Sequence, residues 1–572
     1  MKIWRVNLKT NEFNIEPTPE HWSHLGGRGL IAQILVDEVN ASCDPLGSEN
    51  KLIFAPGLLV GHRLSSLDRI SIGGKSPLTG GIKEANAGGR TGYHLAQLGI
   101  KALILEEQPE NPEWKILMID NDGVHFEDGS DLIGNGVYEC APKIIEKYGD
   151  EIALALIGPG GEMRMKAAGI QNIDKDEVPS RIAARGGLGA VMGSKFVKAI
   201  VIDASGGDRP SLIDKGAFKE ARKVYTKALL EHPQTKSYTD YGTAAMTDMT
   251  NHFGALPTRN FSAGSFEGAE KISGDALRDL LLRRGGVSNT SHACMAGCSI
   301  KCSNVFGDES GKEVISSPVE YETIGLMGSN LGIDSLDSIA KLNWIVNDLG
   351  IDSIEIGAAL GVACEADLMK FGDADRAAEL LNEIRQGSEL GRILGDGAVS
   401  VGKAYGVDRV PTVKNQAMSA YDPRAVKGTG VTYATSPQGA DHTCGLTIRA
   451  KIDHRSPEGQ VDLSMISQYK MAGYDTLGAC LFAGFGFAVA NQTIAQLINA
   501  RYGTDFGDDI LVVLGKESIR LELEFNRMAG FTNADNRLPK WMTEEVLPQA
   551  NTAFDVPDQD LDSIFAGLSE SA

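Results

Sequence analysis

Three cysteines spaced four residues apart constrain this chain more than any other feature. Cys294, Cys298 and Cys302 lie in the segment HACMAGCSIKCSN (residues 292–304), in a chain with 8 cysteines among 572 residues. Their C-x3-C-x3-C pattern is not that of a zinc site, and a cubane iron–sulfur cluster needs a fourth thiolate. The pattern therefore predicts a metal-binding loop, bent at Gly297, that takes a fourth cysteine from elsewhere. The alternative is a helix with three thiols on one buried face.

Size and charge exclude several classes of protein. A chain of 572 residues is too long for one core, so about two to four domains are expected. The formal net charge of −21 repels nucleic-acid phosphates. There is no signal peptide at the N-terminus and no apolar run of about 18 residues that could span a bilayer. We therefore expect a cytoplasmic protein with no nucleic-acid partner and no membrane insertion, in which Cys43, Cys140, Cys364 and Cys444 are unpaired.

Residues 1–208 are predicted to form a domain rich in strands. Short runs of Ile, Leu and Val, bounded by Gly, Pro, Asn or Asp, indicate strands, and helical patterns between them are few. This pattern favours packed sheets over regular βαβ winding. The runs are KIWRVNL, KLIFAP, RISIGG, KALILEE, KILMID, IALALIG and KAIVID.

Arginines accompany glycine-rich turns in this domain. Such turns permit positive φ and bring backbone amides close to an anionic or planar ligand, and guanidinium groups beside them bind phosphates or polar heterocycles. No turn satisfies a nucleotide-binding motif, so a nucleotide is not the expected ligand. The arginines are Arg69, Arg90, Arg181 and Arg185, and the turns are at 26–30, 73–81, 86–92, 158–161 and 184–193.

From about residue 209 the sequence has helical periodicity with glycine stops. Prolines and weak periodicity at 407–425 indicate a further boundary, and helices resume at about 459–473, 481–501 and 508–529. The last twenty residues, which are acidic and contain proline, are expected to form a tail. The prediction is an α+β protein with domains at 1–208, 209–410 and 411–572.

Two hexapeptides in the helical half are alike. NDLGID (347–352) and DTLGAC (475–480) each follow a helical segment and place a glycine where a helix can end in a left-handed residue. Ordinary helix caps would give the same pattern. The second hexapeptide ends in Cys480, which is the most natural donor of the missing fourth thiolate.

These segments together resemble the aldehyde:ferredoxin oxidoreductase family of tungsten enzymes. The hexapeptides resemble its two pterin-binding motifs, DxxGLD and DxxGLC. The resemblance implies a sheet-rich saddle that carries a tungsten, or molybdenum, bis-pyranopterin and is covered by two mainly helical domains. Besides the cysteine segment, the supporting matches are NAGGRTG (86–92), ARGGLGAVMGSK (184–195), EYET (320–323), AYDPR (420–424) and GVTYATSPQGADH (430–442).

The resemblance also implies which residues bind the cofactors. A [4Fe-4S] cluster would be held by Cys294, Cys298, Cys302 and Cys480. The pterins or their phosphates, with Mg²⁺ between the phosphates, would be contacted by Arg69, Asn86, Gly88 and Arg181. The polar edges of the two pterin rings would bind Asp352 and Asp475.

For catalysis the resemblance implies a Glu–His pair. Glu322 of EYET would be the general base, with Glu320 as the alternative, and His442 would donate a hydrogen bond to the aldehyde oxygen. The implied activity is anaerobic oxidation of a small aldehyde to its carboxylic acid. Electrons would leave singly through the cluster to ferredoxin or an iron–sulfur subunit.

Two other functions remain open at this point. One is the catalytic subunit of an ATP-independent benzoyl-CoA reductase, and the other is a cofactor-binding protein without catalysis. The positions that match the family's iron-binding ExxH motif are Lys341 and Trp344, which argues against a metal-bridged dimer. Other homo- or hetero-oligomers are compatible with the sequence.

Overall fold

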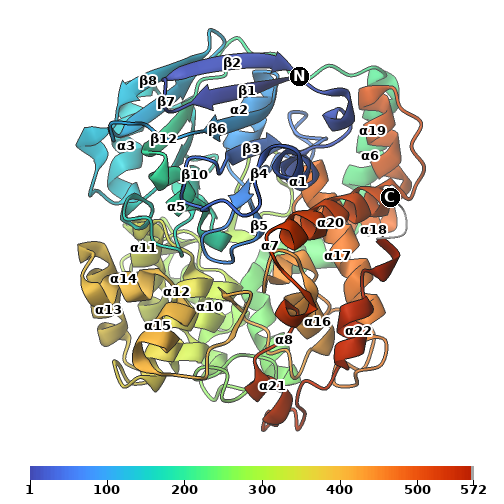
Figure 1. Ribbon diagram of the computed structural model, residues 1–572. Helices are drawn as coiled ribbons and strands as arrows, with labels where there is room; N and C mark the ends of the chain where they lie inside the picture. The colour runs from blue at the N-terminus through green and yellow to red at the C-terminus, as the bar shows by residue number, and fades with distance from the viewer. Residues whose placement is uncertain (569–572) are drawn as a thin grey trace.

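The computed structural model describes residues 1–568 and confirms a sheet-rich N-terminal region followed by mainly helical regions (Figure 1). Two six-stranded sheets have the strand orders β2-β1-β6-β3-β4-β5 and β11-β10-β9-β12-β7-β8. The first sheet consists of β1 (Lys2–Asn7), β2 (Glu12–Pro17), β3 (Leu52–Pro56), β4 (Ile70–Lys75), β5 (Ile82–Ala87) and β6 (Ile100–Glu106). The second consists of β7 (Lys115–Ile119), β8 (Val124–Asp128), β9 (Ala153–Leu156), β10 (Ile170–Ile173), β11 (Pro179–Ala183) and β12 (Val197–Ile202).

The two sheets pack face to face, and helices cover their outer faces. In β6, Leu103 and Leu105 belong to the core between the sheets, whereas Ala102 and Ile104 pack with helix α1 (Gly27–Glu38). A strand that is buried on both sides has a nearly continuous apolar sequence. Each of the runs predicted as strands contains a strand. The far face of the second sheet is covered by α3 (Val137–Tyr148), as the left side of Figure 1 shows.

The predicted helices of the second half are confirmed, except that residues 481–501 form two helices. The long helices are α6 (Lys215–Glu231), α9 (Gly274–Arg284), α11 (Leu336–Leu349), α12 (Ser353–Glu365), α13 (Ala374–Gln386), α17 (Gln460–Leu477), α19 (Gln492–Tyr502) and α20 (Ile510–Met528). Shorter ones include α7 (Pro233–Tyr241), α8 (Met246–Phe253), α10 (Tyr321–Met327), α14 (Glu389–Gly395), α15 (Ala398–Tyr405), α16 (Lys427–Thr435), α18 (Gly484–Val489) and α21 (Lys540–Glu544). Within residues 1–568 no single helix is long and apolar enough to cross a membrane, and Gln460–Leu477 with Leu481–Val489 passes only as a pair bent by 105°.

The C-terminal segment packs where the sequence predicted a tail. Within 553–568 the chain forms α22 (Asp558–Ser563), and Phe554 and Leu561 are buried in the large core of the helical half. The prediction of a tail is therefore wrong for these residues. Their scattered apolar side chains pack into the core, which local composition does not reveal. Residues 569–572 lie outside the described residues. The division of the helical half at residue 410 stays a prediction.

Candidate active site

The three neighbouring cysteines lie in a loop. This loop joins β13 (Asn289–His292) to β14 (Ser303–Gly307), and no residue between them is helical. Gly297 has a φ of +82°, a left-handed conformation that glycine adopts without strain and that turns the chain between the cysteines. The predicted bent loop is confirmed and the helical alternative is wrong.

Cys480 joins the loop cysteines from the end of α17. The helix ends at Gly478 in the left-handed conformation, and the Cys480 backbone amide donates to the carbonyl of Ser66 at 2.7 Å. Burial, and after it the nearby thiols of Cys298 and Cys480, raise the pKa of Cys294 to about 12. Burial and its neighbours, Glu320 and the other three thiols, likewise raise the pKa of Cys302. Neighbouring thiolates repel one another, so thiols grouped in this way need a cationic centre to stay deprotonated together.

The four thiols do not converge on a single ion. Among residues 1–568 no group of three or more His, Cys, Asp or Glu side chains has the geometry to hold one metal ion. A cubane cluster places each thiolate on a different iron, so its four sulfurs surround a larger volume than one ion.

Arg69, Asn86 and Gly88 lie beside the cysteine loop. The Arg69 guanidinium donates to the Asn86 backbone carbonyl at 2.9 Å and also to its side-chain oxygen. A Cβ atom at Gly88 would lie 3.1 Å from the Cys294 sulfur and 3.8 Å from Arg69 Nη1. A side chain at position 88 would therefore occupy space between the cysteine loop and Arg69.

Arg181 on β11 connects the sheets to the same loop. Its guanidinium donates to Ser303 Oγ at 2.9 Å and lies 3.2 Å from His292 Nδ1. Its Nε is buried and has no hydrogen-bond partner among the described residues. Buried donors are almost always paired, so this atom points to a ligand that completes the site.

The first hexapeptide places Asp352 opposite an arginine. Gly350 ends α11 in the left-handed conformation with a φ of +67°, and Asp352 caps α12 by accepting from the Ile354 amide at 3.0 Å. Asp352 Oδ2 lies 3.0 Å from Arg185 Nε, yet neither atom forms a hydrogen bond within residues 1–568. Burial raises the pKa of Asp352, and Arg185 opposes that rise.

The second hexapeptide places Asp475 in a different buried charge cluster. Asp475 Oδ2 lies 3.3 Å from Arg28, which itself forms a buried ion pair with Glu522 at 2.7 Å. Burial and then the neighbouring Glu84 raise the pKa of Asp475 well above its ordinary value, although Arg28 opposes them. Glu84 Oε1 is buried without a hydrogen-bond partner in the described part of the chain. The two hexapeptide carboxylates thus face two separate polar regions.

Glu322 and His442 meet although they lie far apart in the sequence. His442 Nε2 is 3.3 Å from Glu322 Oε1, and its Nδ1 is 2.9 Å from Ser419 Oγ. The Ala420 amide donates to the other oxygen of Glu322 at 2.8 Å. Burial raises the pKa of Glu322, with the nearby His442 acting against the rise. A carboxyl group of this kind can exchange a proton near neutral pH more readily than an exposed one.

Glu320 points to a different part of the molecule. It accepts from the Thr243 hydroxyl, and its second oxygen lies 3.4 Å from Ser303 Oγ, next to the cysteine loop. Burial raises its pKa, and the Thr243 bond lowers it. The two glutamates of EYET therefore have separate environments, and only Glu322 contacts His442.

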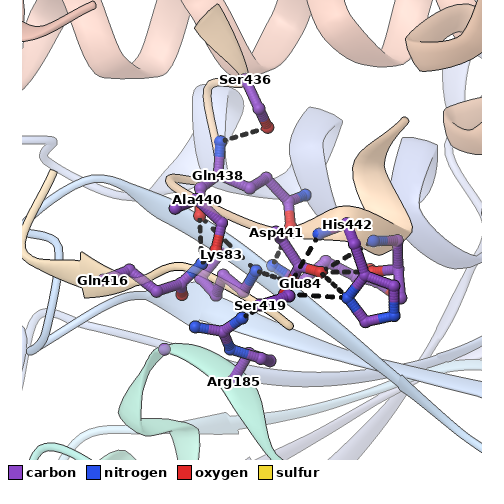
Figure 2. A network of polar contacts seen from close by, with 12 residues as sticks. Lys83, Glu84, Arg185, Gln416, Ser419, Ser436, Gln438, Ala440, Asp441 and His442 are labelled. Atoms are coloured by element: carbon purple, nitrogen blue, oxygen red, sulfur yellow. Dashed lines mark hydrogen bonds and ion pairs between the residues drawn. The ribbon is translucent and has the colours of Figure 1, made fainter. Parts of the chain in front are cut away.

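A buried charge network beside His442 was not identified as a site from the sequence (Figure 2). Lys83 on β5 is fully buried and pairs with Asp441 at 3.0 Å, and Arg185 donates to the Ala417 carbonyl at 2.6 Å. Burial alone would raise the pKa of Asp441, but Lys83 and Arg185 outweigh it and hold that pKa well below its usual range. The available sequence signal for this network was Lys83, which precedes the NAGGRTG segment within a strand.

Fold and site together define a class of protein. Four buried thiols around one loop, unpaired buried polar atoms and a Glu–His pair are typical of an oxidoreductase that contains a metal cofactor. Comparison with known proteins agrees. The family description "Aldehyde ferredoxin oxidoreductase, N-terminal domain" matches residues 3–204, and "Aldehyde ferredoxin oxidoreductase, domains 2 & 3" matches residues 220–566. The chain belongs to the aldehyde ferredoxin oxidoreductase family and is an oxidoreductase by this membership.

Individual relatives cover nearly all of the chain. The tungsten-containing aldehyde ferredoxin oxidoreductase of Thermococcus kodakarensis is 33% identical, over 96% of this chain and 92% of its own. That of Pyrococcus furiosus is 32% identical, over 95% of this chain and 91% of its own. The aliphatic sulfonate oxidoreductase, WOR-like subunit, of Pyrococcus furiosus is 29% identical over 74% of this chain and 72% of its own.

The fold also matches a solved structure. The active site complex BamBC of benzoyl coenzyme A reductase, in complex with 1,5 dienoyl-CoA, superposes with a TM-score of 0.82. The match covers 99% of this chain and 94% of that chain at 19% sequence identity. At this identity the likeness describes the fold and not the reaction.

Proposed function

We propose that this protein oxidises an aldehyde to its carboxylic acid at a tungsten bis-pyranopterin and passes the electrons through a [4Fe-4S] cluster to ferredoxin or an iron–sulfur subunit. The observation that carries the proposal is the partly buried Glu322–His442 pair at 3.3 Å. It combines a proton acceptor with a hydrogen-bond donor, which oxidation of a carbonyl carbon requires. Molybdenum is the alternative metal, because the same ligands bind both and metal supply often decides.

The buried polar atoms without partners support a large polar cofactor. Within the described residues these atoms include Arg181 Nε and Glu84 Oε1, whereas Arg185 Nε and Asp352 Oδ2 form no hydrogen bond but lie 3.0 Å apart as an ion pair. An unpaired buried polar atom costs about 1–3 kcal/mol, so Arg181 Nε and Glu84 Oε1 favour a polar ligand. In the proposal, Asp352 and Asp475 bind the polar edges of the pterin rings. Arg69, Asn86, Gly88 and Arg181 contact the pterins or their phosphates.

The four cysteines have the composition of a cluster site. Cys294, Cys298, Cys302 and Cys480 supply four thiols in one buried region, and Arg69 and Arg181 lower the pKa of Cys294 against the effect of burial. Nearby guanidinium groups would also offset the negative charge of a thiolate-bound cluster. The Mg²⁺ expected between the pterin phosphates stays a prediction.

The proposed reaction converts an aldehyde and one water into a carboxylic acid, two protons and two electrons. A metal centre held at this site would supply a two-electron acceptor, and a cluster held by the four cysteines would supply a one-electron outlet. The Glu322 carboxylate accepts a proton from the water that attacks the carbonyl carbon. His442 donates a hydrogen bond to the carbonyl oxygen, and the Ser419 hydroxyl, 2.9 Å from His442 Nδ1, orients the imidazole ring.

Two measurements test this proposal. Protein purified without oxygen is expected to contain tungsten or molybdenum and about four irons per chain, as one cubane cluster requires. It is also expected to reduce a viologen dye when an aldehyde is supplied, and Glu322→Ala and His442→Ala are each expected to abolish that reduction. Activity that survives both substitutions would refute the assigned pair.

The main alternative is a catalytic subunit of the benzoyl-CoA reductase type. The sequence left this candidate open, and the fold that the chain shares with that complex, at a TM-score of 0.82, does not separate the two reactions. The assay separates the two, because aldehyde-dependent viologen reduction is expected only for the first, and oxidation of a 1,5-dienoyl-CoA only for the second. A cofactor-binding protein without catalysis would contain the metals and perform neither reaction.

A further inference from the structure

Residues 65 and 66 lie between helix α6 and the cysteine loop and contact both. The inward Tyr225 donates its hydroxyl to the Ser65 carbonyl at 2.8 Å, and Ser65 Oγ accepts from the Ser299 amide at 2.9 Å. Ser66 Oγ is 3.6 Å from the Cys298 sulfur. A short bonded path therefore runs from α6 through residues 65 and 66 to the cysteines.

The outer surface of α6 is basic and exposed, although the chain as a whole has a net charge of −21. Lys223 pairs with Glu220 at 2.7 Å and Lys227 lies 3.9 Å from Glu231, but Lys219 and Arg222 form no ion pair with a carboxylate within residues 1–568. Val224 and Leu230, which are 46% and 55% exposed, lie among the charges. We call this surface the α6 basic face, and its cations are Lys215, Lys219, Arg222, Lys223 and Lys227.

The α6 basic face continues to the exposed tip of the cysteine loop. Arg222 donates to the backbone carbonyl of Arg63 at 3.3 Å, and this carbonyl oxygen would lie 3.6 Å from a Cβ atom at Gly297. Arg63, Ala296 and Gly297 are all exposed. The exposed tip of the cysteine loop therefore lies beside a positively charged surface on an acidic protein.

We propose that the α6 basic face, with Arg63, is the docking surface for a small acidic one-electron carrier protein. The inference rests on the proposed function, because it assumes that a cluster on the four cysteines delivers electrons to a partner. Electron tunnelling falls steeply with distance, so a carrier gains most by binding where the cluster is nearest to solvent. Positive charge there would attract an acidic carrier and orient it, whereas the negative remainder of the surface would repel it. The exposed Val224 and Leu230 add apolar contact area.

A charge-reversal pair of variants tests the docking surface. The test variant is Lys219→Glu/Lys223→Glu/Lys227→Glu. The control is Lys370→Glu/Lys403→Glu/Lys540→Glu, which changes three exposed lysines near α13, α15 and α21, at the lower end of Figure 1 and away from α6. Both variants have the same net charge, so any general repulsion of an acidic partner is equal in the test variant and the control.

In this assay the protein receives its electrons from a chemical reductant, without any substrate. Holoenzyme reduced with dithionite and freed of excess reductant is mixed with a small oxidised acidic ferredoxin, and the second-order rate of ferredoxin reduction is measured by stopped flow. We expect the test variant to lose about 10- to 1,000-fold and the control to keep the wild-type rate. The wild-type rate is expected to fall as salt is raised from about 0.01 M to 1 M, because screening shortens from about 30 Å to 3 Å.

Three outcomes would overturn the proposal. They are an unchanged rate in the test variant, an equal loss in the control, and equally fast wild-type transfer to a basic carrier protein. A change in oligomeric mass of the test variant with an unchanged ferredoxin rate would show that the face pairs copies of this chain, and would also overturn it. Aldehyde-dependent viologen reduction is measured separately on the same proteins. The small dye needs no docking surface. If the wild-type protein shows no aldehyde-dependent viologen reduction, the proposed function is refuted and the docking result is unaffected.

Discussion

Replacing Glu322 with glutamine tests the catalytic pair directly. The substitution keeps size and shape, and the amide oxygen can still accept from the Ala420 amide, which now donates to Glu322 at 2.8 Å. It removes the proton acceptor that faces His442 at 3.3 Å. Loss of a positioned general base lowers the rate about 100- to 10,000-fold, which corresponds to about 3 to 5 kcal/mol of transition-state free energy.

The pH dependence gives the sharper test. A general base works as the carboxylate, so kcat/KM of the wild type is expected to fall as pH drops through the pKa of Glu322. Burial raises that pKa above its ordinary value of 4.5, so the loss begins at a higher pH than for an exposed glutamate. In Glu322→Gln this acidic limb disappears. The measurement is aldehyde-dependent viologen reduction across the pH range, with metal content and thermal unfolding as controls for loading and folding.

Glu320→Gln is the matched comparison, because Glu320 is buried two positions away and faces Thr243 and Ser303. It is expected to lose less activity than Glu322→Gln and to keep the acidic limb. A larger loss of activity in Glu320→Gln than in Glu322→Gln would refute the assignment of Glu322 as the base. So would an acidic limb that persists in Glu322→Gln.

Three further predictions concern the cofactor site. Cys480→Ser removes one of four thiols, and elemental analysis is expected to find fewer than about four irons per chain; full iron content would contradict the ligand set. Gly88→Ala places a methyl group 3.1 Å from the Cys294 sulfur and is expected to lower iron content, with secondary structure by circular dichroism unchanged. Lys83→Met removes the buried lysine that pairs with Asp441 at 3.0 Å and is expected to reduce the free energy of unfolding by about 3–5 kcal/mol in urea titration; an unchanged unfolding midpoint would show that the ion pair is dispensable.

The sequence determined the local structure of this protein and much of the membership of its site. Strands buried on both faces have continuously apolar sequences, so their runs in the first 208 residues could be recognised one by one. Gly350 and Gly478 stop helices in the left-handed conformation, as the two hexapeptides predicted. The cysteine loop and Cys480 were predicted as one ligand set; the structure brings Cys480 close enough to influence the pKa of Cys294 and Cys302, and the ligand role stays a prediction.

Only the tertiary structure decided which side chains meet. Glu320 and Glu322 are two residues apart, yet one faces the cysteine loop and the other faces His442, because the chain enters α10 between them. Lys83 and Asp441 are separated by 358 positions, and no local pattern identifies such a partner. The α6 helix was predicted as a helix, but its place beside the cysteines comes from the packing of Phe218, Tyr225 and Leu229 into a core that includes Cys298. Periodicity reports backbone preference and burial, whereas partners and their pKa values are set by packing between distant segments.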